Sequence, residues 1–440
     1  MRPKVLVPQA TLLVAFALAV QYLGEGSAAS ADVFHALVAP MSTYKWLFAP
    51  RFRRNAFGWR SDKPIERIKE ALAEIRQVAR LEPVLAAEGA IVFLEKLSPA
   101  LMGVDSSSGS LGTAVNRAIE TLVPLLVQAD VDLATRQRWL DRLWEAIEED
   151  EMPYIEHLAD FWGELCTRSD IASEWADRFL PILQRMWSPQ ETAFGYFQGT
   201  DACLSALLAA GRAEELLALV EMAKYKSWHT RRWGFKALLA LGRKADAVRY
   251  AEASRGLNAP EGQIAQACEA LLLNSGLVDE AYARYGIEAN QKTTYLATFR
   301  AIAKKYPSMD PAAILQDLVK STPGAEGKWF AAAKDAGLLE LAAGLASYSP
   351  TDPLTLSRAA RDYAAKEPKF ALAAGLSSLQ WMARGYGYEL IAMDVSQAYQ
   401  AVLASGRALG FSDEEIRNLV SAVVATPAAT GNFVQRVLKL

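Results

Sequence analysis

Apolar residues recur along most of this chain with the spacing of an amphipathic α-helix. In the clearest case, after Pro64, apolar residues return every three or four positions and charged residues fill the positions between them. These apolar residues are Ile65, Ile68, Leu72, Ile75 and Val78. Strand-like alternation is essentially missing. The pattern therefore predicts an all-α fold with no significant sheet.

Helix start signals support this prediction. Asp310 and Asp352 each stand directly before a proline, which is the form of an N-cap followed by proline in the first helical turn. Ser412 and Glu415 have the spacing of a capping box. Together with the punctuation by glycine and proline, these signals predict about twenty helices of ordinary length.

The second half of the chain contains an internal repeat. Three segments each combine an apolar helix end, a glycine and a second helix: ALLAAGRAEELLALVE at 206–221, ALLALGRKADAVRYAE at 237–252 and LLLNSGLVDEAYARYG at 271–286. Their glycines are Gly211, Gly242 and Gly276, and a weaker copy, AAAKDAGLLELAAGLA, contains Gly337. We expect the small residue to let two helices pack closely at a tight turn, and stacked pairs to bury a common core.

These segments resemble tetratricopeptide repeats and their relatives, in which glycine is followed by an acidic residue and by alanine before an aromatic, as in GLVDEAYARY. The resemblance covers roughly residues 190–350. It implies a right-handed, irregular α-solenoid of antiparallel helix pairs. Residues 52–170 also resemble an uncharacterised family of bacterial hypothetical proteins, through FRRNAFGWRSDKPIERIKEA and VDSSSGSLGTAVNRAIE. That second resemblance implies no activity.

Four regions are expected along the chain. Residues 1–40 form a leader, 41–63 a basic and aromatic segment, 64–190 an N-terminal helical domain and 191–440 the helical-repeat solenoid. Residues 1–31 have the parts of a secretory signal, but the apolar run within them is too short to span a bilayer.

Met41 is an alternative start, which would leave the preceding leader outside the true protein. The arginines that follow position 50 oppose translocation when they come soon after an export signal. We therefore expect a cytoplasmic protein without a stable membrane span, with an exported protein as the alternative.

Composition removes several classes of function. Lys and Arg (47) nearly balance Asp and Glu (50), so the net charge of −3 gives no global attraction to nucleic acid or to anionic membranes. Three scattered cysteines support neither a disulfide framework nor a metal clamp, and three histidines argue against a histidine-rich metal centre. The GxGxxG, HExxH, GxSxG and kinase signatures are missing. We expect no cofactor and no enzymatic activity.

The segment KYKSWHTRRWGFK, at 224–236, is the first candidate binding site. Nucleic acid bases or phosphorylated peptides are held by such mixtures, since guanidinium groups pair with phosphate and rings stack or attract cations. In the alternative interpretation both tryptophans are solenoid core and the cations are a solvated edge. The residues assigned to this site are Lys224, Lys226, Trp228, His229, Arg231, Arg232 and Trp233.

The loop GVDSSSGSLGT, at 103–113, is a second candidate because it leads directly into a helix. Hydroxyl groups and free backbone N–H groups at a helix N-terminus can hold an anion. The loop lacks the GK[ST] ending of a P-loop, and the alternative is a capped connection between helices. The residues of this possible anion site are Ser106, Ser107, Ser108 and Ser110.

Two further clusters have a structural alternative of their own. Glu156, Asp160 and Glu164 are spaced to line one helix face beside His157, as a site for acid–base chemistry or as a solvated face. The arginines and aromatics of 51–63 suit an arm that binds nucleic acid or an acidic partner, or a cap that closes the helical stack.

The sequence as a whole therefore favours a non-enzymatic interaction module or scaffold that binds a protein or peptide on its stacked helices. A nucleic-acid-associated protein that uses the basic aromatic patch is the alternative. The partner, the pathway and the oligomeric state do not follow from these residues.

Overall fold

The computed structural model of this chain describes residues 44–188, 195–256, 261–425 and 432–440. Throughout these ranges the ordered elements are helices, and no β-strand occurs in them, which confirms the expected all-α class. The leader at 1–40 lies outside the described residues. The chain divides into two compact units, the first ending at Gly211 and the second running from Arg212 to the C-terminus, with the short stretch 187–190 grouped with the second.

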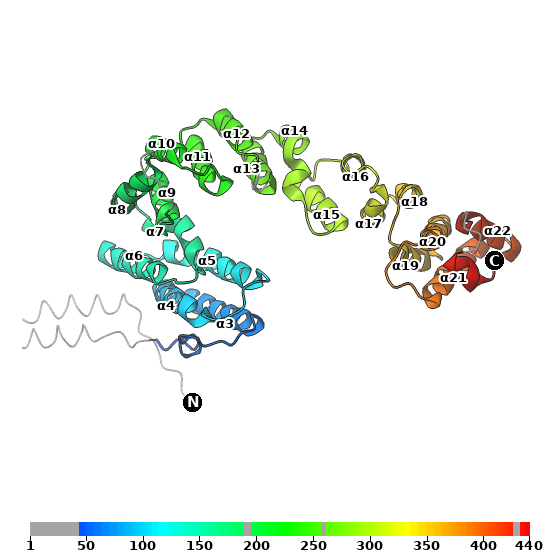
Figure 1. The fold of residues 1–440 in the computed structure, drawn as a ribbon, viewed down its shortest axis with the longest axis horizontal. Helices are drawn as coiled ribbons and strands as arrows, with labels where there is room; N and C mark the ends of the chain where they lie inside the picture. The colour runs from blue at the N-terminus through cyan, green and yellow to red at the C-terminus, as the bar shows by residue number, and fades with distance from the viewer. Residues whose placement is uncertain (1–43, 189–194, 257–260, 426–431) are drawn as a thin grey trace, which may run out of the picture. The chain divides into compact units, whose positions relative to one another are not determined.

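The first unit is built from long helices that pack on their neighbours in the sequence (Figure 1). Its last helix packs against α7 and the 3₁₀ helix η2, which is why the unit extends beyond the expected boundary at residue 190. The elements are η1 (Ala49–Arg51), α3 (Asp62–Ala79), α4 (Pro83–Leu101), α5 (Ser110–Gln128), α6 (Leu133–Glu148), η2 (Glu156–Phe161), α7 (Trp162–Cys166), α8 (Ser169–Trp187) and α9 (Thr200–Ala209).

Helix α3 shows how the apolar spacing becomes a packed face. Ile68, Leu72 and Ile75 are buried against α4 and α5, while Glu66 and Lys69 are exposed. The three apolar residues fall on one side of the helix because they recur at its own period. Their burial confirms the face predicted from the sequence.

The second unit continues the pattern with shorter helices. Successive elements contact one another along the chain, as α10 with α11 and α11 with α12. The elements are α10 (Ala213–Met222), α11 (Trp228–Ala240), α12 (Lys244–Glu252), α13 (Glu261–Asn274), α14 (Val278–Ala281), the π-helix η3 (Tyr282–Gly286), η4 (Glu288–Asn290), α15 (Tyr295–Lys305), α16 (Pro311–Lys320), η5 (Glu326–Trp329), α17 (Phe330–Asp335), α18 (Leu339–Tyr348), α19 (Pro353–Tyr363), α20 (Pro368–Ala383), α21 (Ala392–Ala408), α22 (Asp413–Val424) and α23 (Phe433–Leu438).

One hydrophobic core runs through most of the second unit, from Trp228 in α11 to Ala401 in α21. A smaller core joins the C-terminal helices, from Leu372 in α20 to Val434 in α23. A core that extends from pair to pair along the chain is the packing expected of stacked helix pairs.

The repeat glycines end the first helix of each pair, and Gly242 shows how. Its φ is +74°, and its N–H donates to Leu239 O at 2.9 Å while Arg243 N donates to Leu238 O at 2.9 Å. This is a Schellman motif, which requires a left-handed residue. A Cβ atom at Gly242 would meet nothing within 4 Å. The glycine is therefore needed for its backbone conformation, and the expectation that it allows close helix packing was wrong.

The helix start signals are confirmed. The side chain of Asp310 accepts a hydrogen bond from Ala312 N at 3.1 Å, and that of Asp352 accepts one from Thr355 N at 2.8 Å. Ser412 and Glu415 form the reciprocal bonds of a capping box. None of the helices in the described ranges combines the length and apolarity needed to cross a bilayer.

Candidate functional site

The tryptophans of the 224–236 cluster belong to the core. Trp228, the first residue of α11, is 4% exposed, and Trp233 is 1% exposed. Trp228 packs edge-on against Phe235, with ring centroids 5.9 Å apart. Neither ring can stack on a ligand from this position, so the aromatic half of the expected recognition patch is structural, as the alternative interpretation had it.

Arg231 is also buried, at 8% exposed, which corrects its expected place in an open cationic surface. Its Nε donates to Ser254 Oγ at 2.7 Å, and its Nη1 lies 3.4 Å from Glu221 Oε1. The guanidinium carbon lies 3.9 Å from the centroid of the Tyr250 ring. Arg231 therefore connects α11 to α10 and α12, and contributes to their packing.

The remaining cluster residues lie nearer to solvent. Lys224, Lys226 and His229 are exposed, and Lys226 Nζ lies 3.0 Å from Glu221 Oε2. Arg232 is half-buried, and its Nε donates to the His229 carbonyl at 2.8 Å. The structure thus separates the cluster into a buried part and an exposed part.

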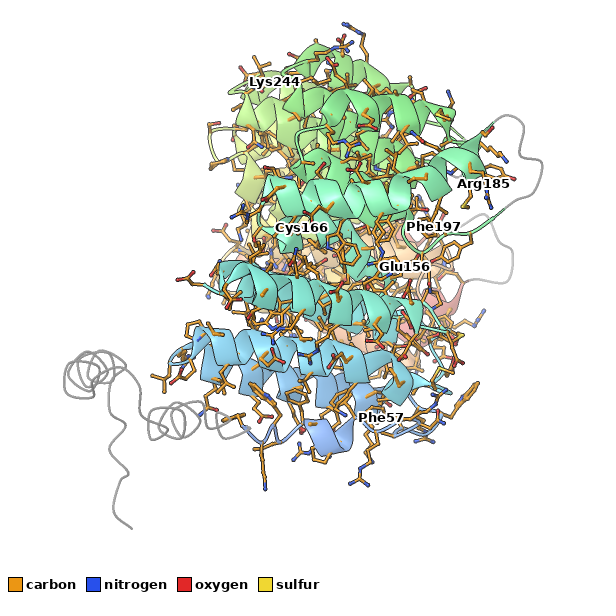
Figure 2. The ribbon with its side chains drawn as sticks, turned by 90° about the vertical axis from the view of Figure 1, so that its left-hand side faces the viewer. Phe57, Glu156, Cys166, Arg185, Phe197 and Lys244 are labelled. Atoms are coloured by element: carbon orange, nitrogen blue, oxygen red, sulfur yellow. The ribbon has the colours of Figure 1, made fainter. Side chains whose placement is uncertain are left out.

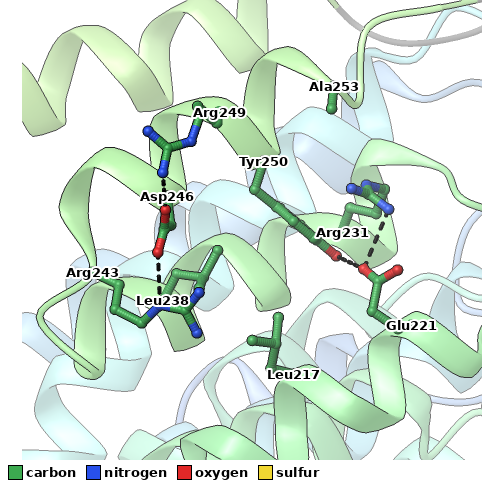
Figure 3. A pocket seen from close by; sticks show the side chains of 9 residues that line it. All are labelled: Leu217, Glu221, Arg231, Leu238, Arg243, Asp246, Arg249, Tyr250 and Ala253. Carbon is green, nitrogen blue, oxygen red and sulfur yellow. Dashed lines mark hydrogen bonds and ion pairs between the residues drawn. The ribbon is translucent and has the colours of Figure 1, made fainter.

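A hollow of about 470 Å³ lies between α10, α11 and α12, next to Arg231 (Figure 3). It combines apolar residues with three arginines and two carboxylates. The residues that line it are Leu217, Glu221, Arg231, Leu238, Arg243, Asp246, Arg249, Tyr250 and Ala253. Of these, the sequence had identified only Arg231.

Ion pairs hold the polar side chains of this hollow, which we call the α10–α12 groove. Arg243 Nε donates to Asp246 Oδ2 at 2.8 Å, and Arg249 pairs with the other oxygen of the same carboxylate. Hydrogen bonds from Arg243 lower the pKa of Asp246. Burial alone would raise the pKa of Glu221, but hydrogen bonds from Tyr250 and Lys226 outweigh it and lower that pKa. Both carboxylates are therefore ionised at neutral pH.

Tyr250 closes one side of the groove. Burial, together with its hydrogen bond to Glu221, raises its pKa, so the hydroxyl stays protonated and acts as a donor. The ring fits because Gly234 faces it: a Cβ atom at that glycine would come within 2.6 Å of the Tyr250 oxygen. The sequence signal for this contact is the tyrosine in GRKADAVRYAE, which becomes informative only when successive repeats are aligned.

The serine loop before α5 is a folded turn. Ser107 N donates to Asp105 Oδ1 at 2.9 Å, and the hydroxyls of Ser108 and Ser110 lie 2.8 Å apart. Ser106 is half-buried, whereas the other three serines are exposed. Asp105 thus supplies a carboxylate of its own to the loop, which opposes the binding of an external anion.

The acidic residues near His157 do not line one helix face. Residues 156–161 are a 3₁₀ helix, with three residues per turn, so the α-helical spacing assumed for Glu156, Asp160 and Glu164 does not hold. Glu156 accepts a hydrogen bond from Tyr196, and Figure 2 shows it beside the neighbouring Phe197. His157 Nδ1 lies 3.0 Å from Asp160 Oδ2, which raises the pKa of the histidine.

The three cysteines are buried, and none of them forms a disulfide. Burial raises the pKa of Cys166 to about 12, so its thiol is not a nucleophile at neutral pH. In the described ranges no group of three or more His, Cys, Asp or Glu side chains is placed to hold a metal ion.

The N-terminal segment, like the 224–236 cluster, combines buried aromatic side chains with exposed cationic ones. Phe48, Phe52 and Phe57 are buried, and Phe52 meets Phe93 of α4 with ring centroids 5.1 Å apart. Phe57 lies at the N-terminal end of the first unit (Figure 2). These rings cover α4, while the arginines of the segment remain at the surface.

Comparison with protein-family models, with curated proteins and with solved structures finds no match for this chain.

Proposed function

We propose that this chain is a non-enzymatic helical-repeat scaffold that binds a peptide or protein partner in the α10–α12 groove. The observation that carries the proposal is the groove itself, in which Leu217 and the exposed Arg243 and Arg249 share one hollow. Scaffolds of stacked helix pairs use such surfaces to hold extended or helical peptides.

The charges of the groove favour an acidic partner. Arg243 and Arg249 share the single carboxylate of Asp246, so two cations face one anion. Their side chains are 53% and 74% exposed, which leaves guanidinium nitrogens accessible to a ligand. An acidic side chain can pair with these nitrogens while an adjacent apolar side chain packs on Leu217. We therefore propose a partner segment in which an acidic residue stands next to an apolar one.

A peptide selection tests this proposal. Peptides selected from a random displayed library should be rich in acidic and apolar residues, and fluorescence anisotropy should show binding at least tenfold weaker to Arg249→Gln than to the unchanged protein. Arg417→Gln is the matched control, because Arg417 is exposed on α22, away from the groove. Selected peptides that bind all three proteins equally would contradict the proposal.

The nucleic-acid alternative has less support, because Trp228 and Trp233 are buried and offer no ring for base stacking. A mobility-shift assay at two salt concentrations distinguishes the two functions, since phosphate contacts weaken steeply as salt rises.

A cytoplasmic location is part of the proposed function and rests on the arginines after position 50, which oppose export.

A further inference from the structure

A second hollow, of about 240 Å³, lies in the first unit and is lined by cations. Arg51 of η1 stands on one side of it, and Lys63 and Arg67, one turn apart on α3, stand on the other. Ala56 and Phe57 complete the lining. We call it the N-terminal hollow, and no residue of it belongs to the α10–α12 groove.

The walls of this hollow are fixed by contacts with α3. Glu74 accepts hydrogen bonds from the backbone N–H groups of Leu47 and Phe48, at 2.7 and 3.0 Å. Glu70 accepts from Nη1 of Arg51 and from Nη1 of Arg67, both at 2.6 Å. The N-terminal segment is therefore held against α3, and both guanidinium groups are oriented before any ligand arrives.

Positive charge remains in the hollow after these pairs are counted. Among the described residues, Glu70 is the one carboxylate that joins Arg51 and Arg67, and its bonds use only Nη1 of each guanidinium. Lys63 is exposed, and its ammonium group makes no ion pair or hydrogen bond with any described residue. Among these four side chains, three cations and one carboxylate leave an excess of two positive charges; Glu66, the other carboxylate that acts on Arg67, is exposed to solvent. Residues 44–63 as a whole contain six lysines and arginines and one aspartate, within a chain of net charge −3.

We propose that the N-terminal hollow binds a phosphoryl group. A dianion matches the excess charge, and the unused guanidinium nitrogens with the Lys63 ammonium are the donors that phosphate oxygens prefer. The hollow is smaller than the roughly 300 to 1,000 Å³ that is usual for pockets of drug-sized ligands. It therefore suits a small anionic group better than a large organic ligand.

The phosphoryl group has two possible sources, a free anion and a lipid headgroup. Leu47 and Trp59 are 69% and 71% exposed on the same segment, and such residues suit contact with a membrane interface. The test therefore has two arms. One is calorimetric titration with pyrophosphate at constant ionic strength, and the other is sedimentation with phosphatidylcholine vesicles that contain phosphatidic acid.

Lys63→Gln is the test variant and Lys69→Gln its control. Both lysines are exposed on α3 and have no partner among the described residues, but Lys69 does not line the hollow. We expect the pyrophosphate Kd to rise at least tenfold in Lys63→Gln and to change less than twofold in Lys69→Gln. Circular dichroism confirms that both variants stay folded.

The outcomes are distinct. Vesicle binding that is lost in Lys63→Gln alone identifies a lipid headgroup as the source, whereas vesicle binding that is absent or independent of Lys63 leaves a free anion as the source. Equal weakening of pyrophosphate binding in both variants overturns the proposal. The proposal also fails if the unchanged protein binds neither pyrophosphate nor vesicles.

Discussion

The phenolic oxygen of Tyr250 lies 2.7 Å from Glu221 Oε1, and this bond joins the second helices of two successive repeats. One repeat later, Tyr285 donates to Glu252 at 2.5 Å. The two glutamates occupy equivalent positions after their repeat glycines, but Tyr285 stands one position later than Tyr250 does. The π-helix at 282–286 takes up that additional residue. The repeats are therefore connected by the same pair of side chains despite their unequal lengths.

We expect Tyr250→Phe to lower the free energy of unfolding by about 1 to 2 kcal/mol, because it removes a hydrogen bond to an ionised carboxylate. Urea denaturation measures the change. Tyr348→Phe is the control, since Tyr348 is 77% exposed and should be neutral. Equal effects of the two substitutions would mean that the bond to Glu221 does not connect the repeats.

Gly242→Ala should destabilise the protein by about 1 to 2 kcal/mol, because an L side chain is strained at a φ of +74°. Gly242→Asn should cost less, since asparagine tolerates the left-handed region. Gly344 is exposed in the interior of α18 without such a φ, so Gly344→Ala should raise stability by about 0.5 to 1 kcal/mol. Thermal unfolding of the three variants checks this order, and a loss of stability in Gly344→Ala would contradict it.

Arg231→Ala should lower the free energy of unfolding by about 2 to 3 kcal/mol, because it leaves a cavity and removes a buried hydrogen bond to Ser254 and a partly buried one to Glu221. Arg232→Ala should change it by less than about 1 kcal/mol, as is usual for more exposed arginines. Denaturation midpoints of the two single variants test the difference. Similar midpoints would indicate that Arg231 is not a packing residue.

The stability contributed by His157 should depend on pH. Its hydrogen bond to Asp160 raises its folded-state pKa above the ordinary 6.5. A raised pKa means that the contribution is complete below pH 6.5 and is lost as pH rises through the folded-state value. The difference in unfolding free energy between the unchanged protein and His157→Gln should therefore shrink from pH 5.5 to pH 9. Asp160→Asn should remove most of this dependence, and a difference that grows with pH would contradict the assignment.

Signals within a few neighbouring residues predicted the local structure correctly. The caps at Asp310, Asp352 and Ser412 and the buried face of α3 depend on spacing within one or two turns, and each was confirmed. The α-helical face expected for Glu156 and Asp160 failed, because the backbone there follows a 3₁₀ helix that apolar spacing does not reveal.

The sequence by itself determined that this chain is helical and where many helices begin, because hydrogen bonds and caps within a helix depend on residues close together in the chain. Only the tertiary structure decided which charged side chains are buried and which face solvent. Arg231 and Arg249 have the same side chain, so residue type does not distinguish them. Arg231 is nevertheless buried between three helices, whereas Arg249 extends toward solvent. That difference depends on which helix packs against each arginine, and such contacts join residues too far apart for a local pattern to specify.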